Sequence, residues 1–438
     1  ECAWAGVRCG SDDDDDNEGE GSDSGSDDYV VTSLELSRNG MGGKLPKEVG
    51  ALLGLTLLNL ERNEVGDSLP EGVFGLVNLK AISLGANKFQ GTISDRLGDL
   101  TELRLLSLYS NGFTGTIPTT IGNLVELVTL NLFSGTVSPT PNTLAIITST
   151  ENSFVGSMPT EIGMLQKLEW FSLGYNSLTG TIPEEIGQLT LLEHLSMTYN
   201  GLGGTMPRSF GNLTNLAFLN LAGNSLDGDT SWFDVIAFHK LEHLDFRVNM
   251  MTGLDLENFV KEGSDKLKWL TLTGNSLAKG SSIPQAIGGM TELTVLDLGD
   301  VGLTGKIPES LGDCSKLLAL FLGSNELTGT IPSILGDLAL LQVLSVDSNK
   351  LTGRVPASLG NLTSLAEFTV FDNNLSGSMP ASICTLRGSS MYMMFASDCL
   401  QDDNVTVPSV VCECCDMCCN GGFCCFLEFD SCFDLSSF

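Results

Sequence analysis

A pattern of apolar residues returns every 24 residues along most of this chain. One copy, residues 168–191, reads LEWFSLGYNSLTGTIPEEIGQLTL. The spacing of its apolar residues fits neither one long helix nor one strand. Repetition at this period is typical of a solenoid, in which each coil buries its apolar edge against its neighbours. The sequence therefore predicts one elongated repeat array.

Each copy begins with a short strand-like alternation. Phe171 and Leu173 alternate with Trp170 and Ser172, so we expect the first two residues in the core and the other two outside. Asn176 follows where the chain must leave the strand. Its amide has donors and an acceptor, so we expect it to bond backbone groups of its own coil and the next one.

The asparagine position allows the repeats to be counted. A final strand through Tyr392 and Met394 should close the stack before Cys399. The series predicts 14 full repeats, at Asn39, Asn63, Asn87, Asn111, Asn152, Asn176, Asn200, Asn224, Asn249, Asn275, Val301, Asn325, Asn349 and Asn373.

The series departs from regularity in two places. Asn111 and Asn152 are 41 residues apart, which is 24 plus 17, so residues 134–150 are predicted to be an insertion. A shortened coil using Leu144 and Ile147, or a gene-model error, remains open. The second departure has spacings of 25, 26 and 26 between Asn224 and Val301. There, residues 231–241 and 256–267 resemble amphipathic helical turns, and a shaped site is plausible.

These motifs resemble a known family. Residues 317–338, LLALFLGSNELTGTIPSILGDL, are similar to the plant-type leucine-rich repeat, and CAWAGVRC at residues 2–9 resembles the cap that precedes such arrays. The resemblance covers about residues 1–9 and 30–399. It implies an α/β solenoid, a right-handed superhelix with a parallel β-sheet on its concave face. The family includes ectodomains of receptor-like kinases, receptor-like proteins and secreted polygalacturonase inhibitors. The tail CECCDMCC resembles extensions on leucine-rich repeat proteins of diatoms and related algae.

The predicted domain organisation follows from these boundaries. Residues 1–10 form an N-terminal disulfide cap and residues 11–29 an acidic disordered loop. The solenoid runs over 30–399, and 400–438 form a Cys-rich tail. The acidic stretch could instead bind calcium or mineral, although a calcium site needs a defined cage of ligands.

The charge of the chain limits its partners. Lys and Arg total 22 against 54 Asp and Glu, giving a formal charge of −32. Such a chain should repel phosphate, so neither nucleic acid nor an anionic membrane surface is an expected partner. No apolar run reaches the length of a membrane span, so membrane attachment would need a segment absent from this chain. No cofactor is expected.

Thirteen cysteines point to an oxidising compartment and thus to an extracellular or cell-surface location through the secretory pathway. Cys314 should be a buried free thiol. The clustered tail could alternatively hold Zn²⁺ or Cu(I) through thiolates. The twelve cysteines predicted to form disulfides are Cys2, Cys9, Cys384, Cys399, Cys412, Cys414, Cys415, Cys418, Cys419, Cys424, Cys425 and Cys432. Predicted glycosylation sites are Asn212, Asn361, Asn374 and Asn404.

Large side chains occupy one outward position in five successive repeats, and these are the candidate ligand-binding residues. The aromatic side chains could instead pack on one another and shield the strand backbone. Asp245 and Arg247 should pair with each other, and no nucleophile and base are brought together, so an enzyme is not expected. The predicted ligand-binding residues are Trp170, His194, Phe218, His243 and Trp269, flanked by Tyr175, Tyr199 and Arg247.

The leading hypothesis is a non-enzymatic extracellular recognition protein that binds a protein, peptide or glycan on the concave face. One alternative is a structural or adhesive coat protein that depends on its acidic segments. Another, implied by the resemblance alone, is an inhibitor of a secreted hydrolase.

Overall fold

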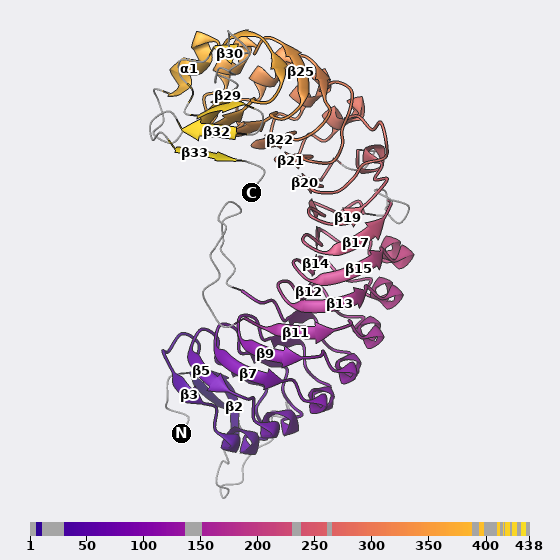
Figure 1. Ribbon diagram of the computed structural model, residues 1–438. Coiled ribbons are helices and arrows are strands. Elements are labelled where there is room, and N and C mark those ends of the chain that lie inside the picture. Colours follow the sequence, from indigo (N-terminus) through magenta and orange to yellow (C-terminus); the bar gives the residue numbers. More distant parts are fainter. Residues whose placement is uncertain are drawn as a thin grey trace, which may run out of the picture. The chain divides into compact units, whose positions relative to one another are not determined.

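The fold was analysed in a computed structural model, which describes residues 6–10, 30–135, 151–229, 238–260, 265–387, 394–397, 410–411, 415, 417–420, 423–426 and 431–434. Two compact units make up the chain, Glu1–Leu216 and Ala217–Phe438. Figure 1 shows the successive strands of each unit side by side.

In the first unit, one short strand per repeat pairs in parallel with the strand of the next repeat, as Phe171 pairs with Leu195. The cap strand β1 (Val7–Gly10) instead pairs antiparallel with the first of them. We call these the inner strands: β2 (Val30–Glu35), β4 (Leu57–Asn59), β6 (Ala81–Ser83), β8 (Leu105–Ser107), β10 (Thr129–Asn131), β12 (Trp170–Ser172) and β14 (His194–Ser196).

A second row of parallel strands follows the asparagine position. These outer strands are β3 (Gly42–Lys44), β5 (Glu64–Asp67), β7 (Lys88–Thr92), β9 (Gly112–Gly115), β11 (Ser153–Gly156), β13 (Ser177–Thr181) and β15 (Gly201–Thr205).

A short 3-10 helix ends each repeat of the first unit. Proline precedes most of these helices, and its fixed φ holds the chain extended before the turn, as at Pro183 (φ −72°, ψ 147°). The Pro183 carbonyl accepts a hydrogen bond from the Ile186 amide at 3.1 Å. The helices are η1 (Lys47–Ala51), η2 (Glu71–Gly75), η3 (Asp95–Asp99), η4 (Thr119–Asn123), η5 (Thr160–Met164), η6 (Glu184–Gln188) and η7 (Arg208–Asn212).

The second unit continues the inner pattern with β16 (Phe218–Asn220), β18 (His243–Asp245), β20 (Trp269–Thr271), β21 (Val295–Asp297), β22 (Ala319–Phe321), β24 (Val343–Ser345), β26 (Glu367–Thr369) and β29 (Met394–Ser397). Its outer strands are β17 (Ser225–Gly228), β19 (Met250–Met251), β23 (Thr328–Gly329), β25 (Lys350–Gly353) and β27 (Asn374–Leu375). Its helices are η8 (Leu256–Phe259), η9 (Gln285–Gly289), η10 (Glu309–Asp313), η11 (Ser333–Asp337), η12 (Ala357–Asn361) and α1 (Ala381–Arg387).

The tail departs from the predicted end of the sheet. We expected β29 to close the stack before Cys399, but β31 (Met417–Asn420) pairs with β29 in parallel. Two antiparallel strands, β32 (Phe423–Phe426) and β33 (Ser431–Asp434), follow it. β28 (Gly377–Ser378) also pairs with β30 (Val410–Val411). The predicted end was therefore wrong, because tail strands cover the open edge of β29.

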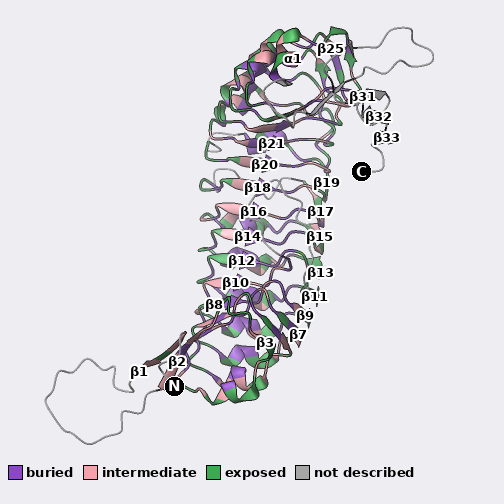
Figure 2. Cartoon of the chain, turned by 90° about the vertical axis from the view of Figure 1, so that its left-hand side faces the viewer, coloured by how far each residue is buried: buried purple, intermediate pink, exposed green. Residues whose placement is uncertain are grey.

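The core holds the residues that the alternation placed there. Phe171 and Leu173 are fully buried, and the Phe113 ring stacks between those of Phe89 and Phe154 at centroid distances of 6.3 and 6.5 Å. Figure 2 shows the buried residues in the interior of the coils. Stability therefore comes from neighbouring coils that share one core.

The asparagines form the predicted ladder. Asn111 is fully buried; its Nδ2 donates to the carbonyls of Leu84 at 3.0 Å and Leu108 at 3.1 Å, and its Oδ1 accepts from the Phe89 amide at 3.0 Å. One side chain thus bonds its own coil and the preceding one. Such bonds matter because buried backbone groups are costly when left unpaired.

The ladder also spans the predicted insertion. The Phe113 amide donates to Asn152 Oδ1 at 3.1 Å, so Asn152 takes the position after Asn111 despite the 41-residue interval. Strand β10 pairs directly with β12 across the same interval. Residues 136–150 of the predicted insertion lie outside the described residues, and the exact number of repeats remains a prediction.

The outer strands of the second unit are interrupted where the repeat spacing changes. After β19, the described outer residues pair only through isolated bridges, Leu254 with Leu277 and Lys306 with Thr328, before β23 begins a new row. Helix η8 provides the predicted helical turn near residue 256, with Leu256 and Phe259 buried. The other predicted turn falls largely on residues 230–237, outside the described residues.

Candidate ligand-binding face

We call the side of the inner strands that points away from the core the solvent face. On the first unit it carries Trp170 and His194 side by side, because β12 and β14 pair residue for residue. The two rings stack with centroids 3.5 Å apart and an interplanar angle of 3°. Trp170 is still 43% exposed, and the position before it on β10 is held by the small residue Thr129. The Trp170 indole thus combines a rigid stack with open surface.

Tyr175 and Tyr199 form a second aromatic pair just after the inner strands of the same two repeats. Their rings stack at 4.6 Å and 28°, and the edge of Phe133 meets Tyr175 at 5.4 Å. The tyrosines are 36% and 43% exposed. Both hold a positive φ, 57° and 49°, which turns the chain sharply after each strand. The first unit therefore presents exposed aromatic surface along two neighbouring repeats.

The second unit carries the other three predicted aromatic positions. His243 stacks between Phe218 at 4.2 Å and Trp269 at 5.3 Å, and all three side chains are half-buried. Stacking covers both faces of the His243 ring, and the ring atoms His243 Nε2 and Trp269 Nε1 are buried as well. The packing alternative is thus supported for these three residues, whereas ligand contact by any member of the predicted set remains a prediction.

Arg247 pairs with Asp245, as the sequence predicted. Arg247 Nε lies 3.2 Å from Asp245 Oδ2, and Asn220 Nδ2 donates to the same oxygen at 3.3 Å. Asp245 is only 1% exposed. Burial raises the pKa of Asp245 to about 6, although Arg247 opposes the shift. Burial, reinforced by Arg247, lowers the pKa of His243 to about 4, so this imidazole is neutral at pH 7.

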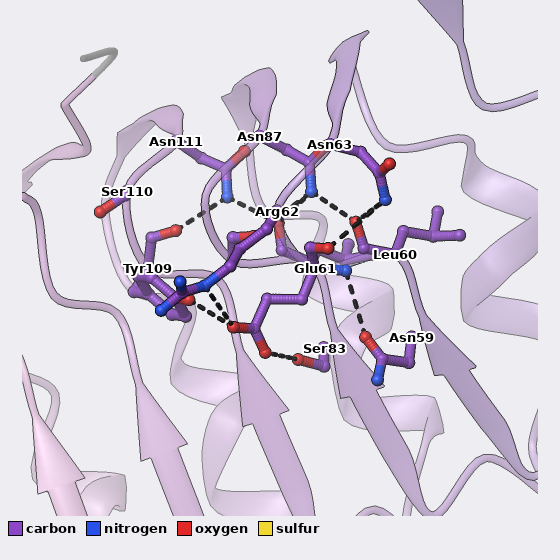
Figure 3. A network of polar contacts seen from close by, with 12 residues as sticks. Asn59, Leu60, Glu61, Arg62, Asn63, Ser83, Asn87, Tyr109, Ser110 and Asn111 are labelled. Carbon is purple, nitrogen blue, oxygen red and sulfur yellow. Dashed lines mark hydrogen bonds and ion pairs between the residues drawn. The ribbon is translucent and has the colours of Figure 1, made fainter. Parts of the chain in front are cut away.

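A polar cluster on the first unit was missed by the sequence analysis. Tyr109 Oη donates to Glu61 Oε1 at 2.6 Å, Ser83 Oγ donates to Glu61 Oε2 at 3.2 Å, and Arg62 Nε lies 3.3 Å from Glu61 Oε1 (Figure 3). The Tyr109 ring crosses the intervening repeat at Gly85, where an added Cβ would lie 2.1 Å from Tyr109 Cε1. The signal was available, because residues 61, 85 and 109 are one repeat apart.

The structure describes several of the cysteines and three of the four sequons. Cys9, Cys384 and Cys415 are disulfide-bonded, and Cys314 is a buried free thiol as predicted. The rest of the predicted disulfide map remains a prediction. Asn212, Asn361 and Asn374 are exposed, and the first two end η7 and η12. Asn404 lies outside the described residues.

A cavity of about 960 Å³ lies in the irregular stretch of the second unit. Its lining includes Glu257 of η8 and three prolines of successive repeats, Pro284, Pro308 and Pro332. This stretch is where the altered spacing made a shaped site plausible. Among the described residues, no helix is both long and apolar enough to cross a membrane.

Comparison with known proteins agrees with this geometry. The Leucine Rich Repeat family matches residues 102–124, 167–189, 191–213 and 340–362. No curated protein sequence matches the chain.

Several solved structures share the fold. A TDR receptor is 29% identical with a TM-score of 0.69, over 83% of this chain and 63% of its own. The plant peptide hormone receptor RGFR1, solved in complex with RGF2, is 26% identical with a TM-score of 0.57, over 90% of this chain and 71% of its own. A leucine-rich repeat protein of Leptospira interrogans is 28% identical with a TM-score of 0.61, over 83% of each chain. This chain is therefore a leucine-rich repeat protein with a receptor-like ectodomain fold.

Proposed function

We propose that the chain is a non-enzymatic extracellular recognition protein and that the solvent face of its first unit binds a peptide or protein ligand. The observation that carries this proposal is the exposure of Trp170, Tyr175 and Tyr199 on neighbouring repeats of a rigid sheet. Large aromatic side chains bury much area at small entropic cost, which suits them to contact surfaces.

The geometry favours an extended polypeptide as ligand. Trp170 and Tyr175 lie at opposite ends of one repeat's strand, and their stacking partners hold them in place. A ligand that spans both pairs would meet two aromatic anchors separated by the small residues Ser172 and Gly174. RGFR1, which shares this fold, was solved with the peptide hormone RGF2 bound. Two of the three solved structures named above are receptors, which supports recognition rather than catalysis as the function of this chain.

The disulfides and the solved receptors support an extracellular location. Disulfides at Cys9, Cys384 and Cys415 are typical of oxidising compartments. Exposed sequons at Asn212, Asn361 and Asn374 would be available for glycosylation there. We therefore place the protein at the cell surface or outside the cell, with glycans on the turns that carry Asn212 and Asn361.

The test is a binding experiment with a displayed library of random peptides. Peptides selected on the wild-type protein should lose about tenfold or more in affinity when Trp170, Tyr175 and Tyr199 are each changed to Ala, as expected for anchor residues. The matched control changes Leu53, Val125 and Leu340, which are exposed to a similar extent on outer turns, and should leave affinity unchanged. Equal losses in both variants, or a large fall in melting temperature for the aromatic variant, would contradict the proposal.

A further inference from the structure

The cavity in the second unit lies where the regular outer turn is lost. In a regular repeat the proline follows the asparagine by seven residues, but Pro284 follows Asn275 by nine. Seven residues after Asn249 the chain has Leu256 instead of proline, and this buried leucine begins η8. Helices η9, η10 and η11 each pack closely on the next helix, whereas η8 lacks such packing on η9. The cavity of about 960 Å³ opens at this break in the packing.

The floor of the cavity is aliphatic. Val260, Ile283 and Ile307 line it and are all buried. Pro308 and Pro332, which also line it, are buried too. The lining contains no aromatic side chain, although sugar rings are commonly held by stacking on aromatic rings. The floor therefore suits an aliphatic side chain better than a glycan, because burying aliphatic surface is favourable without any special geometry.

The cavity extends along the array. Its lining comes from four successive repeats, beginning with Glu257 and continuing through Pro284 and Pro308 to Pro332. Neighbouring coils lie about 4.8 Å apart at their strands, so three steps from coil to coil span about 14 Å. An extended polypeptide rises about 3.3 Å per residue, so about four residues match this length. The dimensions of the cavity therefore favour a segment of extended chain as its occupant.

Three charged side chains lie at the rim of the cavity. Glu257, Lys306 and Glu309 line it and are exposed. Nearby, Lys316 forms an ion pair with Glu292 of the preceding repeat, but within the described ranges none of the three rim side chains has such a partner. Two acids against one base leave one negative charge in excess at the rim. A basic ligand would complement this charge, as it would the net charge of −32 of the whole chain.

We propose that this cavity binds an extended segment of a polypeptide partner in which an arginine or lysine stands next to an aliphatic residue. The aliphatic side chain packs on Val260, Ile283 and Ile307. The basic side chain pairs with Glu257 or Glu309 at the rim. The length of the cavity, its aliphatic floor and its excess negative charge each favour this ligand. The site goes beyond the proposed function, because it lies on the second unit and shares no residue with the aromatic surface of the first.

The experiment uses the full chain with ¹³C-labelled isoleucine methyl groups and follows their NMR signals during titration with the amide of acetyl-Leu-Arg-Leu. The signals of Ile283 and Ile307 should shift and saturate. Those of Ile117 and Ile182, which precede the prolines of regular repeats and are equally buried, should not move. The same peptide with citrulline in place of arginine keeps the shape but lacks the charge, so it should bind about threefold more weakly. Acetyl-Gly-Arg-Gly amide, which lacks the aliphatic side chains, should not saturate the site.

Variants at exposed positions test the rim while keeping the core intact. Glu257→Gln together with Glu309→Gln should weaken binding of the arginine peptide by about threefold and leave binding of the citrulline peptide unchanged. Ala286→Trp places a large ring at an exposed lining position and should block both peptides. The control Glu48→Gln, at an exposed acid of the regular helix η1, should bind as wild type does. The isoleucine spectrum of each variant shows directly whether its fold is kept.

Three results would overturn the proposal. These are no saturable shift of the Ile283 and Ile307 signals with the arginine peptide, equal affinity for the arginine and citrulline peptides, and an unchanged preference for arginine in the variant with both glutamates replaced. The proposed function is judged separately, because its binding test depends on Trp170, Tyr175 and Tyr199 of the first unit, none of which lines this cavity.

Discussion

The first unit and the irregular stretch of the second unit share a core pattern but differ in their outer strands. From β3 to β15, each described outer strand of the first unit pairs with a neighbour. Between β19 and β23 the outer pairing shrinks to the two isolated bridges. The inner strands β18, β20, β21 and β22 nevertheless stay paired residue for residue.

The difference shows that the inner strands and buried leucines do not depend on a continuous outer sheet. It also shows where polar groups are left over. Of the buried side-chain atoms without a hydrogen bond in the described residues, only Ser134 Oγ lies in the first unit. Where the 24-residue spacing holds, the asparagine side chains of the ladder form hydrogen bonds with the buried backbone amides and carbonyls of neighbouring coils. Where it relaxes, buried polar atoms of His243, Trp269 and Thr271 on β18 and β20 are left without a hydrogen bond.

The largest expected effect comes from breaking the regular unit at its ladder. Asn111→Ala leaves the buried Phe89 amide without its acceptor and removes one of the two asparagine donors to each of the Leu84 and Leu108 carbonyls, so the free energy of unfolding should fall by about 3 kcal/mol. Urea denaturation of the wild-type protein and the variant measures this difference in the free energy of unfolding. The control Asn39→Ala, at an exposed position whose side-chain amide donates only to the Ser37 carbonyl, should cost under about 0.5 kcal/mol. Equal costs would show that the ladder does not stabilise the array.

The next effect concerns Asp245 in the irregular stretch. Its folded pKa of about 6 exceeds the unfolded value of 3.8, so between these values the folded chain holds a proton that the unfolded chain has lost. Stability should therefore fall as the pH rises from about 4 to about 6, by about 2 kcal/mol. Asp245→Asn should remove this part of the pH dependence. Parallel wild-type and variant stability profiles over that range would contradict the raised pKa.

A smaller effect is expected at Gly85. In Gly85→Ala the new methyl group displaces the Tyr109 ring, so the Tyr109–Glu61 hydrogen bond breaks at a cost of about 1.5 kcal/mol. A double-mutant cycle with Tyr109→Ala measures the coupling. Additive losses would show that the ring does not cross this glycine.

The smallest effect should be a gain. Val248 holds φ 53°, which a β-branched residue adopts at a cost, and its side chain is exposed. Val248→Asn should raise the free energy of unfolding by about 0.5 to 1 kcal/mol, since asparagine tolerates this conformation. Ser348→Asn, at φ 50° in a regular repeat, should raise the free energy of unfolding by a smaller amount. A loss at position 248 would mean that the Val248 side chain stabilises the turn.

The repeat spacing predicted most of the fold because local physics determines each coil. The alternation of a strand places Phe171 and Trp170 on opposite faces, and the chain leaves the strand at Asn176. Both features are set by the residues of one coil and do not depend on the rest of the chain. The same spacing predicted the aromatic row, and register confirms that Trp170 aligns with His194 and that His243 aligns with Trp269.

Other features could not be predicted because they depend on distances between coils. The contact of Tyr109 with Glu61 spans 48 residues and needs the gap at Gly85. The unpaired state of the Thr271 hydroxyl depends on how the side chains of three adjacent strands, β18, β20 and β21, pack together. Sequence patterns also ended the sheet before Cys399, because the tail strands lack the repeat motif by which the other strands were recognised.

The most direct test of the central claim is hydrogen–deuterium exchange of the full chain with and without a peptide selected on it. The account predicts slower exchange in residues 170–175 and 194–199, with the outer turns η5 (Thr160–Met164) and η6 (Glu184–Gln188) unchanged. Protection confined to those outer turns, with none on the two aromatic repeats, would contradict it.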